Sequence, residues 1–145
     1  MVRQLNPSAA IIFTVSPVRH LKDGFVENQQ SKAKLLTAVH EVIATDKNSH
    51  YFPSYELMMD ELRDYRFYAE DMLHPNKIAI DYIWERFGES WISAEASAVK
   101  KKVEQLQKGL LHRPFNSESA AHQKFLQDLE IKKQELQRQW PHMEF

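Results

Sequence analysis

A continuous run of apolar and β-branched residues, AIIFTVS, occupies positions 10–16 near the start of the sequence. Its length is that of a strand, and the absence of polar alternation is typical of a strand covered on both faces, as in a parallel sheet. Pro17 ends the run. A second short run at residues 50–52 is halted by Pro53. The pattern therefore predicts two strands, one in each run.

The apolar positions between these two strands recur at helical spacing. They predict a helix over residues 31–44. Strand, helix and strand within about 45 residues form a βαβ unit, whose two strands are parallel. The expected apolar face of the helix consists of Leu35, Leu36, Val39, Val42 and Ile43.

Beyond Pro53 the pattern predicts two further helices, separated by an irregular and aromatic-rich stretch. The first helix is expected over residues 55–62 and the irregular stretch over residues 63–73. Asn76 is the expected N-cap of the second helix, and Gly88 is its expected C-terminal cap. The buried stripe predicted for this second helix consists of Ile80, Ile83, Trp84 and Phe87.

The last third of the sequence has a different pattern, in which apolar residues recur four and three positions apart over almost three heptads. Gly109 interrupts this seam, and a loop at residues 112–116 leads to a second amphipathic helix. The pattern predicts an antiparallel helical hairpin. The seam consists of Ile92, Ala96, Val99, Val103, Leu106 and Leu110, and its counterpart of Phe125, Leu129, Leu136 and Trp140.

The two predicted strands do not make a complete sheet. A two-stranded parallel sheet cannot bury both faces of its strands or protect both of its edges. Residues 10–16 nevertheless have the composition of an interior strand. We therefore expect further strands, either upstream in a longer parent protein or in another chain. On this interpretation residues 1–90 are the C-terminal portion of an α/β domain, and residues 91–145 are a helical extension.

Composition and charge exclude several classes of function. The 145 residues carry 19 basic and 20 acidic side chains, so the net charge of −1 gives no basic excess for a nucleic-acid partner. The absence of cysteine excludes disulfides, thiolate metal sites and cysteine nucleophiles. No stretch approaches the roughly 20 apolar residues that span a bilayer. We therefore expect no membrane partner and a cytoplasmic location.

The sharpest local motif is Asp71-Met72-Leu73-His74-Pro75. In this D-x-x-H arrangement the Asp accepts a hydrogen bond from the His Nδ1–H, which leaves Nε2 as a free base. Such a histidine is suited to take a proton from a hydroxyl nucleophile. The alternative interpretation is a structural Asp–His pair that caps the following helix.

Ser16, Arg19 and His20 follow the carboxyl end of the first predicted strand, where ligands bind in open α/β sheets. Arg19 offers a planar donor fork for a carboxylate, phosphate or sugar oxygen. Its alternative role is an ion pair with Asp23 or Glu27.

Glu56 leaves the second predicted strand at the same edge of the sheet, where it is expected either to orient Arg19 or to contact a ligand. A metal site built from His20, Asp71 and His74 has no support from their spacing. We therefore expect no metal and no cofactor.

Four segments together resemble a known family: TVSPVRH at 14–20, YFPSYE at 51–56, DELRDYRFYAEDMLHPN at 60–76 and YIWERF at 82–87. They resemble the C-terminal blocks of the GSCFA family, a largely uncharacterised bacterial family related to the SGNH, or GDSL-like, esterases and lipases. The resemblance covers roughly residues 8–90, and its motifs fall in order at matching spacing.

This resemblance implies a flavodoxin-like three-layer α/β/α sandwich that hydrolyses small-molecule or carbohydrate esters through Ser, His and Asp. Asp71 and His74 match the block that supplies the acid and base. The GSCFA segment with its serine, and the glycine and asparagine blocks that donate to the oxyanion, have no counterpart in the sequence. The chain alone is therefore expected to be inactive, and to pair with the missing N-terminal part or with itself. The alternative is a non-catalytic binding module that uses the inherited cleft or the hairpin.

Overall fold

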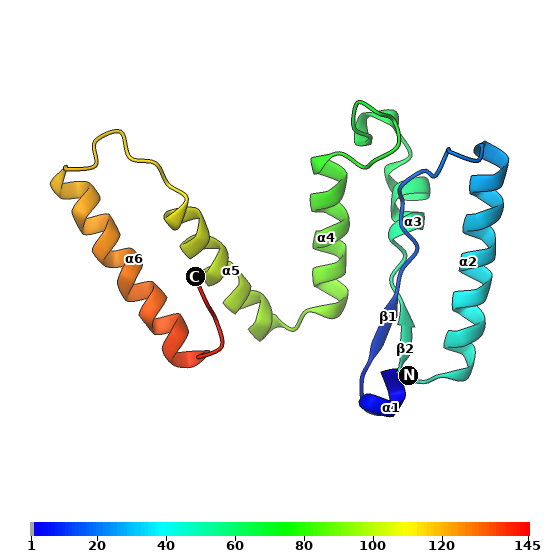
Figure 1. Ribbon diagram of the computed structural model, residues 1–145, viewed down its shortest axis with the longest axis horizontal. Helices are drawn as coiled ribbons and strands as arrows, with labels where there is room; N and C mark the ends of the chain where they lie inside the picture. Colours follow the sequence, from blue (N-terminus) through cyan, green and yellow to red (C-terminus); the bar gives the residue numbers. More distant parts are fainter. Residues whose placement is uncertain (1) are drawn as a thin grey trace. The chain divides into compact units, whose positions relative to one another are not determined.

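The computed structural model describes residues 2–145 (Figure 1). The chain divides into two compact units, residues 1–90 and residues 91–145. The first unit opens with a single helical turn, α1 (Val2–Leu5), and contains both strands. The second unit is helical.

The first unit is built on the predicted βαβ motif, formed by β1 (Ile11–Phe13), α2 (Phe25–Thr45) and β2 (Ser49–Tyr51). The strands pair in parallel, with Ile12 opposite His50. Phe52 N–H donates to the Phe13 carbonyl at 2.8 Å. The next N–H that could extend the pairing, that of Ser54, donates to the Phe52 carbonyl at 2.9 Å instead, so the ladder ends there.

Helix α2 begins earlier than its apolar pattern indicates, directly after Gly24. Gly24 has a φ of 113°, a conformation that other residues rarely adopt, and its carbonyl accepts the N–H of Asn28 at 3.0 Å. The packed stripe of the helix also differs from the expected face, because Leu35 and Val42 are about half exposed. The stripe that packs against the rest of the unit consists of Lys32, Leu36, Val39 and Ile43.

The chain after β2 forms the predicted short helix, but in two parts. Helix α3 (Ser54–Glu56) continues into a π-helix, η1 (Leu57–Leu62). The π-helix ends at Arg63, whose N–H donates to the Met58 carbonyl five residues earlier, at 3.2 Å. A 3₁₀ turn, η2 (Tyr65–Phe67), lies within the stretch expected to be irregular.

The main core of this unit lies between η1 and the following helix, α4 (Lys77–Trp91). Met58 and Ala79 are almost completely buried there, together with Tyr68. Asn76 caps α4 as predicted, because its side-chain oxygen accepts the N–H of Ala79 at 3.1 Å.

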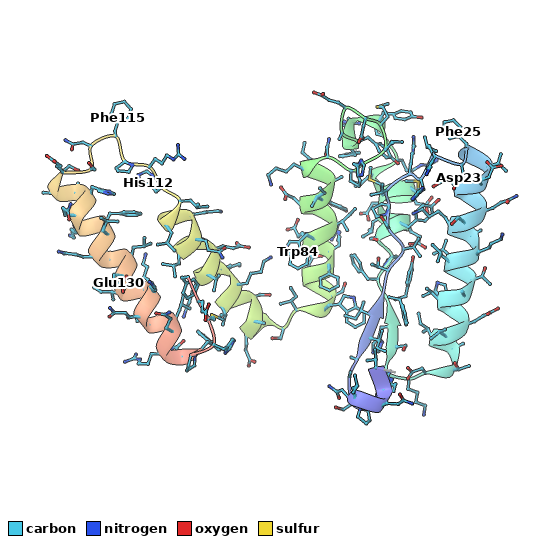
Figure 2. The ribbon with its side chains drawn as sticks, viewed as in Figure 1. Asp23, Phe25, Trp84, His112, Phe115 and Glu130 are labelled. Carbon is cyan, nitrogen blue, oxygen red and sulfur yellow. The ribbon has the colours of Figure 1, made fainter. Side chains whose placement is uncertain are left out.

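Two predictions for α4 are wrong. The helix does not end at Gly88 but continues to Trp91, since one glycine costs only about 1 kcal/mol inside a helix and three further residues extend the hydrogen bonding. Part of the predicted buried stripe is also open. Ile80 and Trp84 are about half exposed. Figure 2 shows Trp84 midway along α4. With Ile12 and Phe52, Ile80 and Trp84 line an apolar hollow of about 410 Å³ beside β1.

The second unit is the predicted helical hairpin, in which α5 (Ala94–Leu110) and α6 (Ala120–Gln139) lie side by side (Figure 1). Leu106, Leu129 and Leu136 form its buried core. Gly109 does not interrupt α5, which is helical through Leu110. A side chain at position 109 would instead clash with Leu129 Cδ1, so the glycine permits the two helices to approach closely.

Within residues 2–145 no helix has both the length and the apolar character needed to cross a membrane.

Replacing Leu106 by alanine is expected to lower the free energy of unfolding of the hairpin by about 2–5 kcal/mol, because Leu106 is 1% exposed and its loss leaves a cavity. Urea denaturation followed by circular dichroism measures the change. The matched control is Leu110→Ala on the same helix, where the side chain is 49% exposed and the expected loss is below about 1 kcal/mol. Equal losses in the two variants would contradict the assigned core.

Candidate functional site

The Asp71-x-x-His74 motif lies in a loop that backbone hydrogen bonds close at its base. Tyr68 and Pro75 form an isolated antiparallel bridge. Ala69 N–H donates to the His74 carbonyl at 2.7 Å, and Asn76 N–H donates to the Phe67 carbonyl at 2.8 Å. The loop is therefore anchored on both sides just before α4 begins.

Asp71 and His74 form the predicted hydrogen bond, with His74 Nδ1 2.6 Å from Asp71 Oδ2. The other carboxylate oxygen, Oδ1, accepts the N–H of Leu73 at 2.9 Å and that of His74 at 3.0 Å. With Nδ1–H directed at the carboxylate, a neutral His74 ring has its free lone pair on Nε2. Both side chains are exposed, so Nε2 is accessible from solvent.

These contacts lower the pKa of the Asp71 carboxyl to about 2. The backbone N–H groups of His74 and Leu73 contribute most, and the His74 side chain contributes next. Asp71 is therefore a carboxylate throughout the neutral pH range. This is the charge state that orients a histidine base and stabilises its protonated form.

Arg19 lies beside this loop. Its N–H donates to the Leu73 carbonyl at 3.1 Å, which joins the segment after β1 to the Asp71–His74 loop. Its guanidinium carbon lies 4.4 Å from the centre of the Tyr68 ring and 5.3 Å from that of Tyr65. These are cation–π distances. The sequence alone did not single out the two tyrosines, because alternating charges and rings are typical of a packed loop.

The alternative role of Arg19, an ion pair with Asp23 or Glu27, is wrong. Within residues 2–145 no carboxylate lies at ion-pair distance from Arg19. Asp23 lies at the start of α2, beside Phe25 (Figure 2). Two tyrosine rings, rather than an acid, hold the guanidinium in place.

Ser16 and His20 belong to the same segment and are both exposed. The Ser16 hydroxyl accepts the N–H of Val18 at 3.2 Å, and the His20 N–H donates to the Asn28 side chain at 2.8 Å. The Ser16 carbonyl accepts a 2.6 Å hydrogen bond from the ammonium of Lys32, which is a buried residue of α2. Lys32 was not among the residues expected at the site, although its spacing four residues before Leu36 places it on the packed stripe.

Glu56 is the last residue of α3, which follows β2, and it does not orient Arg19. Its two carboxylate oxygens accept hydrogen bonds from the Tyr51 hydroxyl at 3.0 and 2.8 Å. Burial of Tyr51, together with the adjacent negative charge of Glu56, raises the pKa of the Tyr51 hydroxyl. Direct contact between Glu56 and a ligand stays a prediction.

Metal binding has no support in the described part of the chain. Across residues 2–145, no three His, Asp or Glu side chains are grouped closely enough to hold a metal ion. His20, Asp71 and His74 are not grouped in this way either.

The Asp71 carboxyl is expected to titrate near pH 2, below the roughly 3.9 of an unperturbed aspartate. Because its pKa is lower in the folded chain, its stabilisation is present above about pH 4 and is lost as the pH falls toward 2. A ¹³C NMR titration measures the midpoint, and Asp71→Asn identifies the signal. In His74→Ala the midpoint should stay depressed, because the two backbone donors remain. A midpoint at the ordinary value in the unaltered chain would contradict this geometry.

Comparison with known families gives two matches along the chain. Residues 1–87 match the GSCFA family, and residues 103–145 match a family described as GSCFA domain protein, C-terminal domain. No curated protein and no solved structure matches the chain. The first match covers more than half of the 145 residues and includes Asp71, His74, Arg19 and Glu56. The chain belongs to the GSCFA family.

Proposed function

We propose that Asp71 and His74 are the acid–base pair of an ester-hydrolase site of the SGNH type. The observation that carries this proposal is the 2.6 Å contact between His74 Nδ1 and Asp71 Oδ2. It supports an orienting role for Asp71, because it directs the base nitrogen Nε2 away from the carboxylate. Membership of the GSCFA family, on the motif block that contains both residues, supports the same assignment.

In the proposed reaction the oxygen of a serine hydroxyl attacks the ester carbonyl, and His74 Nε2 takes the hydroxyl proton in the same step. Collapse of the tetrahedral intermediate expels the alcohol, which takes that proton from His74. A water molecule then attacks the carbonyl of the acyl-enzyme and gives a proton to His74. The serine oxygen leaves, takes that proton back and releases the carboxylic acid. Asp71 keeps its negative charge throughout and stabilises the imidazolium that forms at each step.

The serine and the oxyanion donors are proposed to come from a GSCFA segment outside residues 1–145. We also propose that this segment completes a flavodoxin-like α/β/α sandwich around β1 and β2. Support comes from the apolar hollow beside β1, where Ile12, Ile80 and Trp84 are between about a third and a half exposed. Such side chains gain free energy when further strands or helices cover them.

The substrate is proposed to be a small-molecule or carbohydrate ester. Ser16, Arg19 and His20 lie on the segment that follows β1, and Glu56 lies in α3, which follows β2. The 3.1 Å bond from Arg19 N–H to the Leu73 carbonyl keeps this segment next to His74. We assign these four residues to substrate binding.

A protein that joins residues 1–145 to the GSCFA segment should hydrolyse p-nitrophenyl acetate. Replacing His74 by alanine, or Asp71 by asparagine, is expected to lower kcat by about 10²–10⁴-fold, since general-base catalysis is lost. His142→Ala, at an exposed position near the C-terminus, is the matched control and should keep the full rate. Equal rates for His74→Ala and the unaltered protein would contradict the assigned roles.

The chain of residues 1–145 alone is expected to hydrolyse p-nitrophenyl acetate no faster than buffer, because the sequence holds no GSCFA-type serine. The same assay at high protein concentration measures this. A clear rate would place a nucleophile among residues 1–145 and contradict the proposed division of the site.

A further inference from the structure

A hollow of about 320 Å³ lies where the segment after β1 meets the first turns of α2. We call it the cationic hollow, because Arg19 and Lys32 both line it. Within the described residues its lining contains no aspartate or glutamate. Its other polar walls are Asn28, Gln29 and Tyr55, and its apolar walls include Phe25 and Leu21.

Lys32 is a buried cation that has no counter-ion in the described part of the chain. The residue is 8% exposed, and within residues 2–145 no carboxylate lies within ion-pair distance of its ammonium. One ammonium proton is donated to the Ser16 carbonyl at 2.6 Å, and the Tyr55 ring centre lies 5.8 Å away. An ammonium has three protons to donate, so this contact leaves donor capacity on the hollow side. Burial also lowers the pKa of Lys32, which an anion bound nearby would reverse.

Arg19 is a second cation that no described carboxylate neutralises. Its guanidinium lies over the Tyr68 and Tyr65 rings, and a guanidinium carries five N–H donors, more than its contacts with two tyrosines use. Arg19 also lines a smaller adjoining hollow of about 200 Å³. The acid in the lining of that hollow, Asp64, is already paired with Arg66 at 3.0 Å.

We propose that Arg19 and Lys32 together bind the oxyanion of a small molecule, a carboxylate or a phosphate, in the cationic hollow. Two cations that line one hollow without a carboxylate beside them match such a group, because charge-assisted hydrogen bonds to an oxyanion satisfy both. This inference rests on the proposed function, and it makes the substrate an ester that also carries an anionic group. Arg19 holds that group on the segment bonded to Leu73, the residue before His74.

The direct test is a ¹H–¹⁵N NMR titration of the 1–145 chain with sodium phosphate and, separately, with sodium acetate at constant ionic strength. Saturable shifts are expected at Arg19 Nε–H and at amides around Lys32. Arg19→Gln and Lys32→Met should each weaken binding about tenfold or more, because each removes a charge-assisted contact. The two anion arms decide between phosphate and carboxylate.

Lys34→Met and Arg113→Gln are the matched controls. Lys34 is exposed on the same helix as Lys32, and Arg113 is exposed in the loop between α5 and α6. Both should leave the anion affinity unchanged. Shifts that do not saturate, or equal affinity in Arg19→Gln and the unaltered chain, would overturn the proposal. If Lys32→Met does not fold, Arg19→Gln gives the same decision, because Arg19 lies on a loop and is only half-buried.

A second measurement separates this proposal from the proposed function. In the protein that contains the GSCFA segment, Arg19→Gln should lower kcat/KM for p-nitrophenyl hemisuccinate about tenfold more than it lowers kcat/KM for p-nitrophenyl acetate, since only the first ester carries an anion. Equal losses on both esters would contradict anion recognition by Arg19. Anion binding by the 1–145 chain, combined with no turnover of either ester by the protein that contains the GSCFA segment, would refute the esterase and leave the anion site standing.

Discussion

The parallel pairing of β1 with β2 determines the position of every element at the candidate site. Because both strands run in the same direction, residues 14–20 and 53–56 leave the sheet at the same edge. The Ser54 hydroxyl donates to the Val15 carbonyl at 2.8 Å and shares a 2.6 Å hydrogen bond with Thr14. These contacts replace ladder bonds beyond Pro53, so the segment after β1 stays ordered although no strand accompanies it.

The carbonyl and N–H groups of that segment connect it to the rest of the unit. Ser16 accepts the Lys32 ammonium from α2, and Arg19 donates to Leu73 of the loop before α4. One stretch of backbone therefore joins the helix that carries Lys32 to the loop that carries His74. Buried backbone polar groups require partners, and here those partners come from the segments that carry Lys32 and Leu73.

Features that depend on local spacing could be predicted from the sequence. The D-x-x-H motif contains both ends of its own hydrogen bond, and Asn76 caps the helix that directly follows it. The errors concern long-range packing. Whether Trp84 is covered depends on the elements that lie beside β1, and the environment of Arg19 depends on tyrosines more than 45 residues further along the chain. Lys32 was missed because a lysine on an apolar stripe is read as polar until its burial is known.

The π-helix η1 makes the segment before the tyrosines sensitive to chain length. A π-turn holds one residue more than an α-turn, and each residue of an α-helix rotates the chain by about 100°. Deleting a single residue from Leu57–Leu62 would let this segment relax to an ordinary α-helix, with a changed rotational phase for the residues after the deletion. Tyr65 and Tyr68 would then lose their cation–π contacts with the guanidinium of Arg19. The number of residues between β2 and Tyr65 therefore helps to determine whether the two tyrosine rings reach Arg19.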